Sequence, residues 1–127
     1  MNRKAKILVV DDSSLARRTT RVALEEMGHT VEEAADGTQA LERYFLHRHD
    51  LVILDMVMNG MYGLEVLAKM RELNPDVRVL VATADIQEST QQQTRDAGAA
   101  AFINKPLNRK VLAETVTRIL DGGVVWS

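Results

Sequence analysis

The sequence contains no cysteine among its 127 residues. This absence excludes disulfide bonds, thiolate metal sites and a cysteine nucleophile. The chain also lacks an excess of charge of either sign, because 16 basic residues stand against 18 acidic ones and the formal net charge is −2. Such a balance leaves no electrostatic footprint for nucleic acid or for an anionic lipid surface. We therefore expect neither a nucleic acid nor a membrane as partner.

Long hydrophobic runs are missing near the start of the chain. The longest there, Ile7 to Val10, has four residues, which is shorter than the apolar part of a signal peptide or the ~20 residues of a membrane span. We therefore expect a cytoplasmic protein. Hydrophobic residues make up 46% and charged residues 27% of the chain, a composition typical of a folded globule and not of a disordered or fibrous chain. The length predicts a single domain over residues 1–127, with a core at about 6–121 and a short tail at 122–127.

Apolar segments alternate with amphipathic segments along the chain. Continuous branched runs such as Ile7 to Val10 and Leu51 to Leu54 are typical of strands covered on both faces of a parallel sheet. The predicted strands cover residues 7–10, 30–35, 51–54, 77–83 and 101–103, and a helix follows each of them. Five strands that alternate with five helices through short loops predict an α/β domain, doubly wound around a parallel sheet.

The predicted helices differ in how strongly they are anchored. The apolar stripe of the last helix includes Val111, Leu112, Thr115, Val116, Ile119 and Leu120, and the first two helices are expected to bury Leu15, Val22 and Phe45. Segment 87–97 has three consecutive glutamines and almost no large apolar residue, so its place in the pattern predicts a weakly anchored helix. The histidines His29, His47 and His49 lie away from the predicted strand ends and are expected to be solvated. That position argues against a phosphohistidine donor.

Reactive side chains stand where the predicted strands end. Asp11 and Asp12 follow the first strand, Asp55 the third, Thr83 ends the fourth, and Lys105 follows the fifth. In open parallel α/β sheets the ligand crevice lies beyond the carboxyl ends of the strands, so these side chains are expected to converge on one edge. The same residues could instead act only as helix caps and strand ends, but their combination favours a site.

The charges of these residues indicate their chemistry. Two carboxylates ~4 Å apart repel each other by about 4 kcal/mol at an effective dielectric constant near 20. A hard divalent cation such as Mg²⁺ would neutralise them, because oxygen ligands without Cys or His suit that ion. The ammonium of Lys105 and the hydroxyl of Thr83 are suited to hold phosphoryl oxygens. The site therefore predicts phosphorylation, with one aspartate as the nucleophile toward phosphorus.

Several motifs in this order resemble those of one family. They are Val10-Asp11-Asp12-Ser13, Leu54-Asp55-Met56-Val57-Met58 followed by Gly60-Met61-Tyr62-Gly63, Thr83-Ala84, Ala97-Gly98-Ala99 with Phe102, and Lys105-Pro106. From Ile7 to about Leu120 the chain is similar to the receiver domain of two-component response regulators, especially the single-domain chemotaxis type. The resemblance implies a flavodoxin-like (βα)5 fold with strand order 2-1-3-4-5. It also implies a cis bond between Lys105 and Pro106.

The resemblance assigns a role to each site residue. Asp55 is the phosphoacceptor, Asp12 a direct Mg²⁺ ligand, and Asp11 acts largely through metal-bound water. Asp55 and the backbone carbonyl of Val57 complete the metal ligands expected from the protein. The catalytic set is Asp55, Thr83 and Lys105, because Thr83 and Lys105 contact the phosphoryl oxygens. Thr83 and Phe102 form the switch, which reshapes the surface of helix 87–97, strand 101–103 and the last helix.

The family also implies partners and a mode of action. A sensor histidine kinase or a phosphotransfer protein is the expected phosphoryl donor, and the protein is expected to be a regulatory domain and not an enzyme. Because no effector domain follows Leu120 in this sequence, output is expected through protein contact, by a monomer or weak homodimer. The side chain of Val57 cannot orient an attacking water, which favours a slow loss of the phosphoryl group. Asp85 is expected to tune the same step, and Asn59 stands where the family commonly has proline.

Three other functions remain to be weighed. A degenerate receiver would bind a partner without phosphorylation, against which the complete set of Asp12, Asp55, Thr83 and Lys105 argues. A phosphoaspartate hydrolase would carry an Asp-x-Asp motif after the first strand, which this chain lacks. A flavin-binding module would have a Gly/Thr/Ser cradle for phosphate at that place, where Asp11 and Asp12 would repel it.

Overall fold

The computed structural model describes residues 4–58, 61–84 and 87–122. A central sheet of five parallel strands contains β1 (Lys6–Val10), β2 (Thr30–Ala34), β3 (Leu51–Asp55), β6 (Val79–Thr83) and β7 (Ala101–Asn104). Their spatial order is β2-β1-β3-β6-β7. The predicted α/β fold and the order 2-1-3-4-5 are therefore confirmed.

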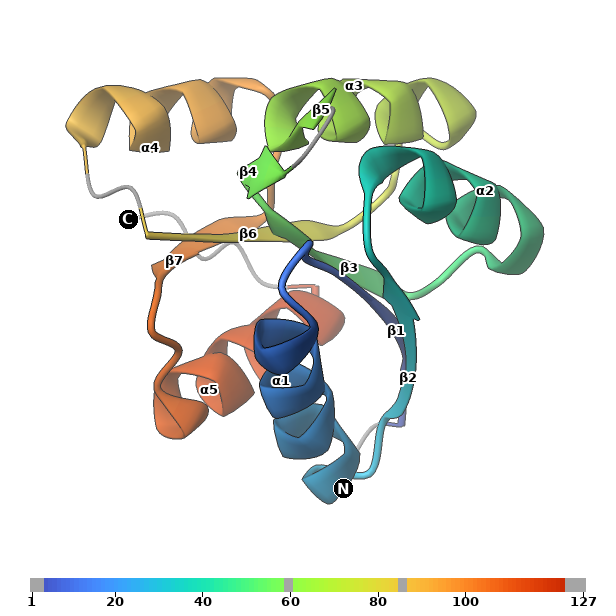
Figure 1. Ribbon diagram of the computed structural model, residues 1–127, viewed down its shortest axis with the longest axis vertical. Coiled ribbons are helices and arrows are strands. Elements are labelled where there is room, and N and C mark those ends of the chain that lie inside the picture. The colour runs from blue at the N-terminus through green and yellow to red at the C-terminus, as the bar shows by residue number, and fades with distance from the viewer. Residues whose placement is uncertain (1–3, 59–60, 85–86, 123–127) are drawn as a thin grey trace.

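Helices cover both faces of the sheet (Figure 1). Helices α1 (Ser14–Glu26) and α5 (Arg109–Leu120) pack on one face, and α2 (Gly37–His47), α3 (Gly63–Leu73) and α4 (Glu88–Asp96) lie over the other. Successive strand residues point to opposite faces, so Leu8 and Val10 join the α2 and α3 side of the core, whereas Ile7 and Val9 join the α1 and α5 side. The continuous apolar runs of the strands are explained by this double cover.

The loop after Asp55 and the start of β6 differ most from the sequence-based expectation, and the other strand ends differ by one residue. The predicted loop after Asp55 contains a small antiparallel ribbon of β4 (Val57–Met58) and β5 (Met61–Tyr62). The strand expected at 77–83 begins at Val79, because a turn occupies the residues before it. In this turn the Asn74 side chain accepts a hydrogen bond from Asp76 N–H, and the Asn74 carbonyl accepts one from Val77 N–H. Asn59, Asp85 and residues 123–127 of the predicted tail lie outside the described residues.

Some apolar residues expected in the core are exposed instead. Leu15, Val22, Phe45 and Val111 are 75%, 38%, 59% and 42% exposed. They lie beside the buried line of their helices, which on α1 runs through Thr20, Ala23 and Leu24. On α2 the buried line passes through Ala40 and Tyr44. Phe45 lies outside that line, and the guanidinium of Arg48 lies over the rings of Tyr44 and Phe45.

The expectation of three solvated histidines was wrong for two of them. His47 is exposed, but His29 and His49 are buried. The imidazole of His29 accepts a hydrogen bond from the Ala5 N–H at Nδ1 (3.1 Å), and the ring of His49 stacks near Tyr44. Both residues precede a strand, so they pack against the amino edge of the sheet. Among the described residues, no helix is long and apolar enough to cross a bilayer.

Candidate functional site

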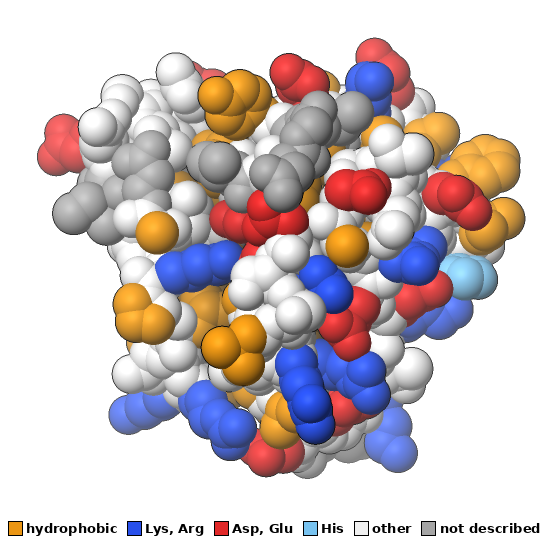
Figure 2. All heavy atoms as spheres, in the orientation of Figure 1, with side chains coloured by type: hydrophobic (Ala, Val, Ile, Leu, Met, Phe, Trp, Pro, Cys, Tyr) orange, Lys and Arg blue, Asp and Glu red, His pale blue; other side chains and the backbone are white. Residues whose placement is uncertain are grey.

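The three predicted aspartates meet at the carboxyl edge of the sheet. Asp11 and Asp12 follow β1 and Asp55 ends β3, and one carboxylate oxygen of each lies within 4.8 Å of the others. Asp11 is buried, Asp55 half-buried and Asp12 exposed. Figure 2 shows acidic side chains gathered near the middle of one face of the molecule. The cluster is therefore held by the fold on one side and accessible to solvent on the other.

Lys105 brings a positive charge to these carboxylates. Its Nζ forms an ion pair with Oδ2 of Asp11 and lies 3.6 Å from Oδ2 of Asp55. The backbone places it there, since Lys105 N–H donates to the Thr83 carbonyl (2.8 Å) and the following bond to Pro106 is cis, as expected. Residues 94 positions apart in the sequence thus meet in one site.

The protein itself orients Asp11. Its Oδ1 accepts a hydrogen bond from Ser13 N–H (2.9 Å), its Oδ2 pairs with Lys105, and its carbonyl accepts from the Arg17 guanidinium (2.7 Å). Ser13 in turn caps α1 by accepting from Ala16 N–H at 3.2 Å. Each Asp11 oxygen therefore has a protein partner, and Asp12 is the exposed member of the three aspartates.

Thr83 and Phe102 lie on adjacent strands near this cluster. Thr83 is the last residue of β6 and is buried, and it pairs with Asn104 of β7. Phe102 is half-buried and packs in the same core cluster as Val81. Thr83 stands two residues after Val81, so its side chain points to that face of the sheet as well. The structure thus places both predicted switch residues on one face, with Thr83 nearer the site.

Gly63 makes a contact that the sequence analysis quoted only as part of a motif. Its N–H donates to the Met56 carbonyl at 2.7 Å. A Cβ atom at Gly63 would stand 2.5 Å from the carbonyl oxygen of Asp55 and 2.9 Å from Cα of Met56. Only glycine lets α3 begin this close to the backbone of Asp55. A glycine three positions after the Asn59-Gly60 pair was the available sequence signal, but the approach itself depends on tertiary packing.

The donor set fits a magnesium ion. Three carboxylates face one ammonium group here, so a divalent cation would balance the remaining negative charge. All side-chain donors are carboxylate oxygens, the ligands that Mg²⁺ prefers. Val57 is in β4, two residues after Asp55, so its backbone is close in the chain to the acidic cluster.

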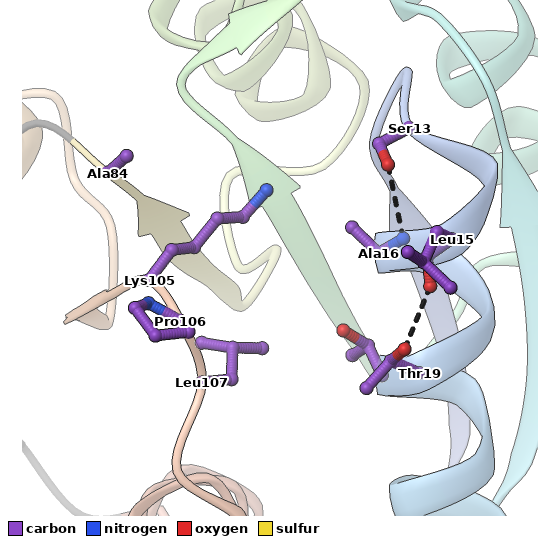
Figure 3. Close-up of a pocket in the computed structure, with 9 residues that line it drawn as sticks. Ser13, Leu15, Ala16, Thr19, Ala84, Lys105, Pro106 and Leu107 are labelled. Carbon is purple, nitrogen blue, oxygen red and sulfur yellow. Dashed lines mark hydrogen bonds between the residues drawn. The ribbon is translucent and has the colours of Figure 1, made fainter.

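A pocket of about 490 Å³ adjoins the site between α1 and the turn after β7. Figure 3 shows Leu15, Ala16 and Thr19 of α1 on one side and Pro106 and Leu107 on the other. The side chain of Lys105 extends from this wall toward the end of the sheet. The lining is mostly apolar, and the exposed Leu15 lines the same pocket as Lys105.

Comparisons with known proteins agree with this geometry. The family model described as "Response regulator receiver domain" matches residues 7–117. Response regulator MprA of Mycobacterium ulcerans is 37% identical over 115 residues, which are 91% of this chain but 50% of that protein. The chain therefore spans about half the length of that relative.

Two further relatives are similar over most of their own length. Sporulation initiation phosphotransferase F of Bacillus subtilis is 33% identical, with 91% of this chain and 93% of that protein covered. A solved CheX–CheY–BeF3–Mg²⁺ complex from Borrelia burgdorferi superposes with a TM-score of 0.86 at 30% identity, covering 90% of this chain and 87% of that one. With the family model, the strand order and the acidic edge in agreement, this chain belongs to the response regulator receiver domain family.

Proposed function

We propose that this chain is a phosphorylation-activated signalling switch that accepts a phosphoryl group on Asp55 in a Mg²⁺-dependent reaction. The observation that carries this proposal is the meeting of Asp55 with two further carboxylates and an ammonium at one sheet edge. Oδ2 of Asp55 lies 3.6 Å from Nζ of Lys105, and the three carboxylates approach within 4.8 Å. A nucleophile, a cation site and a fixed positive charge are thereby brought together.

In this proposal the metal ligands are Asp12 and Asp55 directly, Asp11 largely through water, and the backbone carbonyl of Val57. The contacts of both Asp11 oxygens with Ser13 and Lys105 support an indirect role for that residue. Bound Mg²⁺ would neutralise the carboxylates and the oxygens of the incoming phosphoryl group. Receiver domains generally hold the ion in such an acidic pocket, which supports the assignment here.

The reaction is a transfer of one phosphoryl group between two nucleophiles. An oxygen of the Asp55 carboxylate forms a bond to phosphorus while the bond between phosphorus and the donor nitrogen or oxygen breaks. The donor leaves with the bonding electron pair and takes up a proton. Lys105 moves from its carboxylate partners to a phosphoryl oxygen, and the Thr83 hydroxyl donates to another. Both residues already stand at the correct sheet edge.

Activation would be read on the surface of α4, β7 and α5. Movement of Thr83 toward the phosphoryl group would vacate space on the face it shares with Phe102. A shift from 1% to 99% of the active form requires about 5.5 kcal/mol of differential stabilisation, which several charge-assisted hydrogen bonds can provide.

We expect a histidine kinase or a phosphotransfer protein as the phosphoryl donor, in the cytoplasm. The downstream partner is expected to be a protein, bound by a monomer or weak homodimer of this chain. We also propose that residues 1–127 act as one receiver domain, with slow autodephosphorylation.

The alternative is a receiver that binds its partner without phosphorylation. It would require that the acidic edge no longer accept a phosphoryl group, although Asp11, Asp55 and Lys105 are in contact. The two functions differ in one measurable property, the covalent modification of Asp55.

The test is the intact mass of the protein after incubation with Mg²⁺ and either acetyl phosphate or phosphoramidate. Phosphoramidate carries the P–N bond of a phosphohistidine, so it covers a donor that an acyl phosphate does not resemble. We expect one added phosphoryl group per chain with Mg²⁺ and none after chelation. The variant Asp55→Asn should gain none, because an amide is a poor nucleophile toward phosphorus.

Asp76→Asn serves as the matched control, since Asp76 is exposed in the turn before β6, at the opposite end of the sheet. It should be modified like the unaltered protein. Equal modification of the Asp55→Asn variant would show that another residue is the acceptor. No modification from either donor would favour the phosphorylation-independent interaction module.

A further inference from the structure

A second group of metal-ligating side chains lies away from the acidic edge. Glu32 is on β2, His47 is the last residue of α2, and His49 follows two residues later. Oε1 of Glu32 is 2.9 Å from Nδ1 of His47 and 2.7 Å from Nε2 of His49. One ligand atom of each residue lies within 4.8 Å of the others. Two imidazole nitrogens therefore converge on one carboxylate oxygen.

An unusual backbone conformation brings the two histidines together. Arg48 between them has φ 47° and ψ 59°, the left-handed region, and it is the one non-glycine residue with positive φ in the described part of the chain. This conformation costs about 1–2 kcal/mol for an ordinary residue and persists where its surroundings determine it. The turn at Arg48 leaves the rings of His47 and His49 edge to face, with centroids 5.9 Å apart.

The side chain of His49 has few polar neighbours. It is fully buried, and its Nδ1 has no hydrogen-bond partner among the described residues. The contact between Nε2 and Oε1 of Glu32 is therefore the polar interaction that orients this buried ring. Burial lowers the pKa of His49. Burial disfavours ionisation of Glu32, yet hydrogen bonds from His49 and His47 hold its pKa below its usual value.

From this geometry we propose that Glu32, His47 and His49 form a binding site for a divalent transition metal, with Zn²⁺ as the ion of best fit. Two imidazoles and one carboxylate are a zinc ligand set, and Mg²⁺ prefers oxygen ligands alone. Water would complete the tetrahedron, since the His47 side chain is 46% exposed. Zinc bonds of ~2.0–2.1 Å place tetrahedral ligands roughly 3.3 Å apart, so the contacts of Glu32 with His47 (2.9 Å) and His49 (2.7 Å) would widen by roughly half an ångström.

The positive charges near the site lower its affinity for a metal ion. Arg43 Nε lies 4.0 Å from Oε2 of Glu32, and Lys6 acts on His49 from β1, so both oppose a cation. A metal at Nε2 of His49 also moves the ring proton to Nδ1, where the described residues offer it no acceptor. Zinc sites normally supply such an acceptor, and its loss weakens binding about 10–100-fold. The expected affinity is therefore micromolar.

The site would link two elements at the edge of the sheet opposite Asp55. Both histidines precede β3, and α2 runs from the carboxyl edge to the amino edge of the sheet. A bound ion would hold the end of α2 to β2 without touching the acidic cluster. Binding therefore does not depend on phosphorylation, and the two sites are tested separately.

Isothermal titration calorimetry of the metal-free protein with Zn²⁺ tests the proposal. We expect one ion per chain with micromolar affinity, unchanged by an excess of Mg²⁺. The variant His47→Gln should bind at least about a hundredfold more weakly, because it loses a direct ligand. Because His47 is exposed, the variant should fold as the unaltered protein does. The control His29→Asn removes a histidine outside the cluster and should bind as the unaltered protein does.

Co²⁺ provides a second readout, because its visible absorption reports tetrahedral coordination by nitrogen and oxygen. That band should appear in the unaltered protein and be absent in His47→Gln at equal metal concentration. Unchanged Zn²⁺ binding by His47→Gln, displacement of Zn²⁺ by Mg²⁺, or no binding at micromolar concentrations would each overturn the proposal.

Discussion

At the scale of single residues, the close approach of Gly63 to the backbone of Asp55 links packing to the proposed chemistry. The variant Gly63→Ala introduces a Cβ that the present backbone would hold 2.5 Å from the Asp55 carbonyl oxygen. The start of α3 and the Asp55 backbone must then separate. We expect a loss of about 1–3 kcal/mol in the free energy of unfolding, as for other overpacked sites, and slower phosphorylation from acetyl phosphate. Urea denaturation and the time course of the mass increase measure the two effects.

Gly28→Ala is a suitable control for this change. Gly28 has φ 95° and no atom within 4 Å of an added Cβ, so the substitution costs about 1–2 kcal/mol through backbone conformation alone. It should leave the phosphorylation rate unaltered. If Gly63→Ala is phosphorylated as fast as Gly28→Ala at similar stability, the contact does not position Asp55.

Single residues also show what a sequence can and cannot predict. The placement of Asp11, Asp55 and Lys105 was predictable, because the ends of parallel strands share one edge. The burial of His49 was not, since a residue in a turn is buried only if another element covers it. The steric need for Gly63 likewise depends on how near α3 approaches, which no local pattern encodes.

At the scale of elements, α4 and α5 differ in how much they bury. The described residues of α4 place only Thr90 and Thr94 in the buried class, whereas α5 buries Leu112, Val116, Ile119 and Leu120. Burial of each large aliphatic side chain contributes about 1.5–3 kcal/mol. Elements with few such contacts open locally at lower free energy.

We therefore predict that backbone amides of α4 exchange with deuterium faster than those of α5. Native-state hydrogen exchange followed by mass spectrometry measures this difference, and phosphorylation should alter the protection of α4 more than that of α2. Equal protection of α4 and α5 would contradict the assignment of α4 as a low-stability element.

Elements were predicted best where their pattern was long. Strands β1, β3 and β6 follow from continuous branched runs and α5 from a clear stripe, whereas β2, which contains two glutamates, and α4 follow from their place in the alternation. The ribbon of β4 and β5 was missed because two-residue strands leave no periodicity to detect. The expected burial of Phe45 and Leu15 was also wrong, because both belong to apolar stripes that are wider than the buried line of their helices.

At the scale of the whole molecule, stability should depend on pH through buried histidine. Burial lowers the pKa of His29 from its usual 6.5, and Ala5 N–H donates to its Nδ1, so the folded state holds the neutral ring. The unfolded chain takes up a proton at higher pH than the folded one does. This contribution to stability is therefore complete above pH 6.5 and is lost as the pH falls below it. The lowered pKa of His49 acts in the same direction.

We expect the urea midpoint to fall between about pH 7.5 and about pH 5.5, a range above the titration of ordinary carboxylates. The fall should be shallower in His29→Asn, because the amide oxygen can accept from Ala5 N–H but takes up no proton. Urea titrations at several pH values measure it. Parallel curves for the two proteins would assign the pH dependence to other groups.

The contact between Lys105 and Asp11 has a consequence for the order in which the ribosome makes the chain. All three site carboxylates are translated before their cationic partner, which follows Asp11 by 94 positions and Asp55 by 50. A nascent chain thus carries the acidic residues long before the edge strand that delivers the lysine. Under the proposed function, a product of premature termination would be inactive and not permanently active. The acceptor site is complete only after Lys105, which follows β7, has been translated.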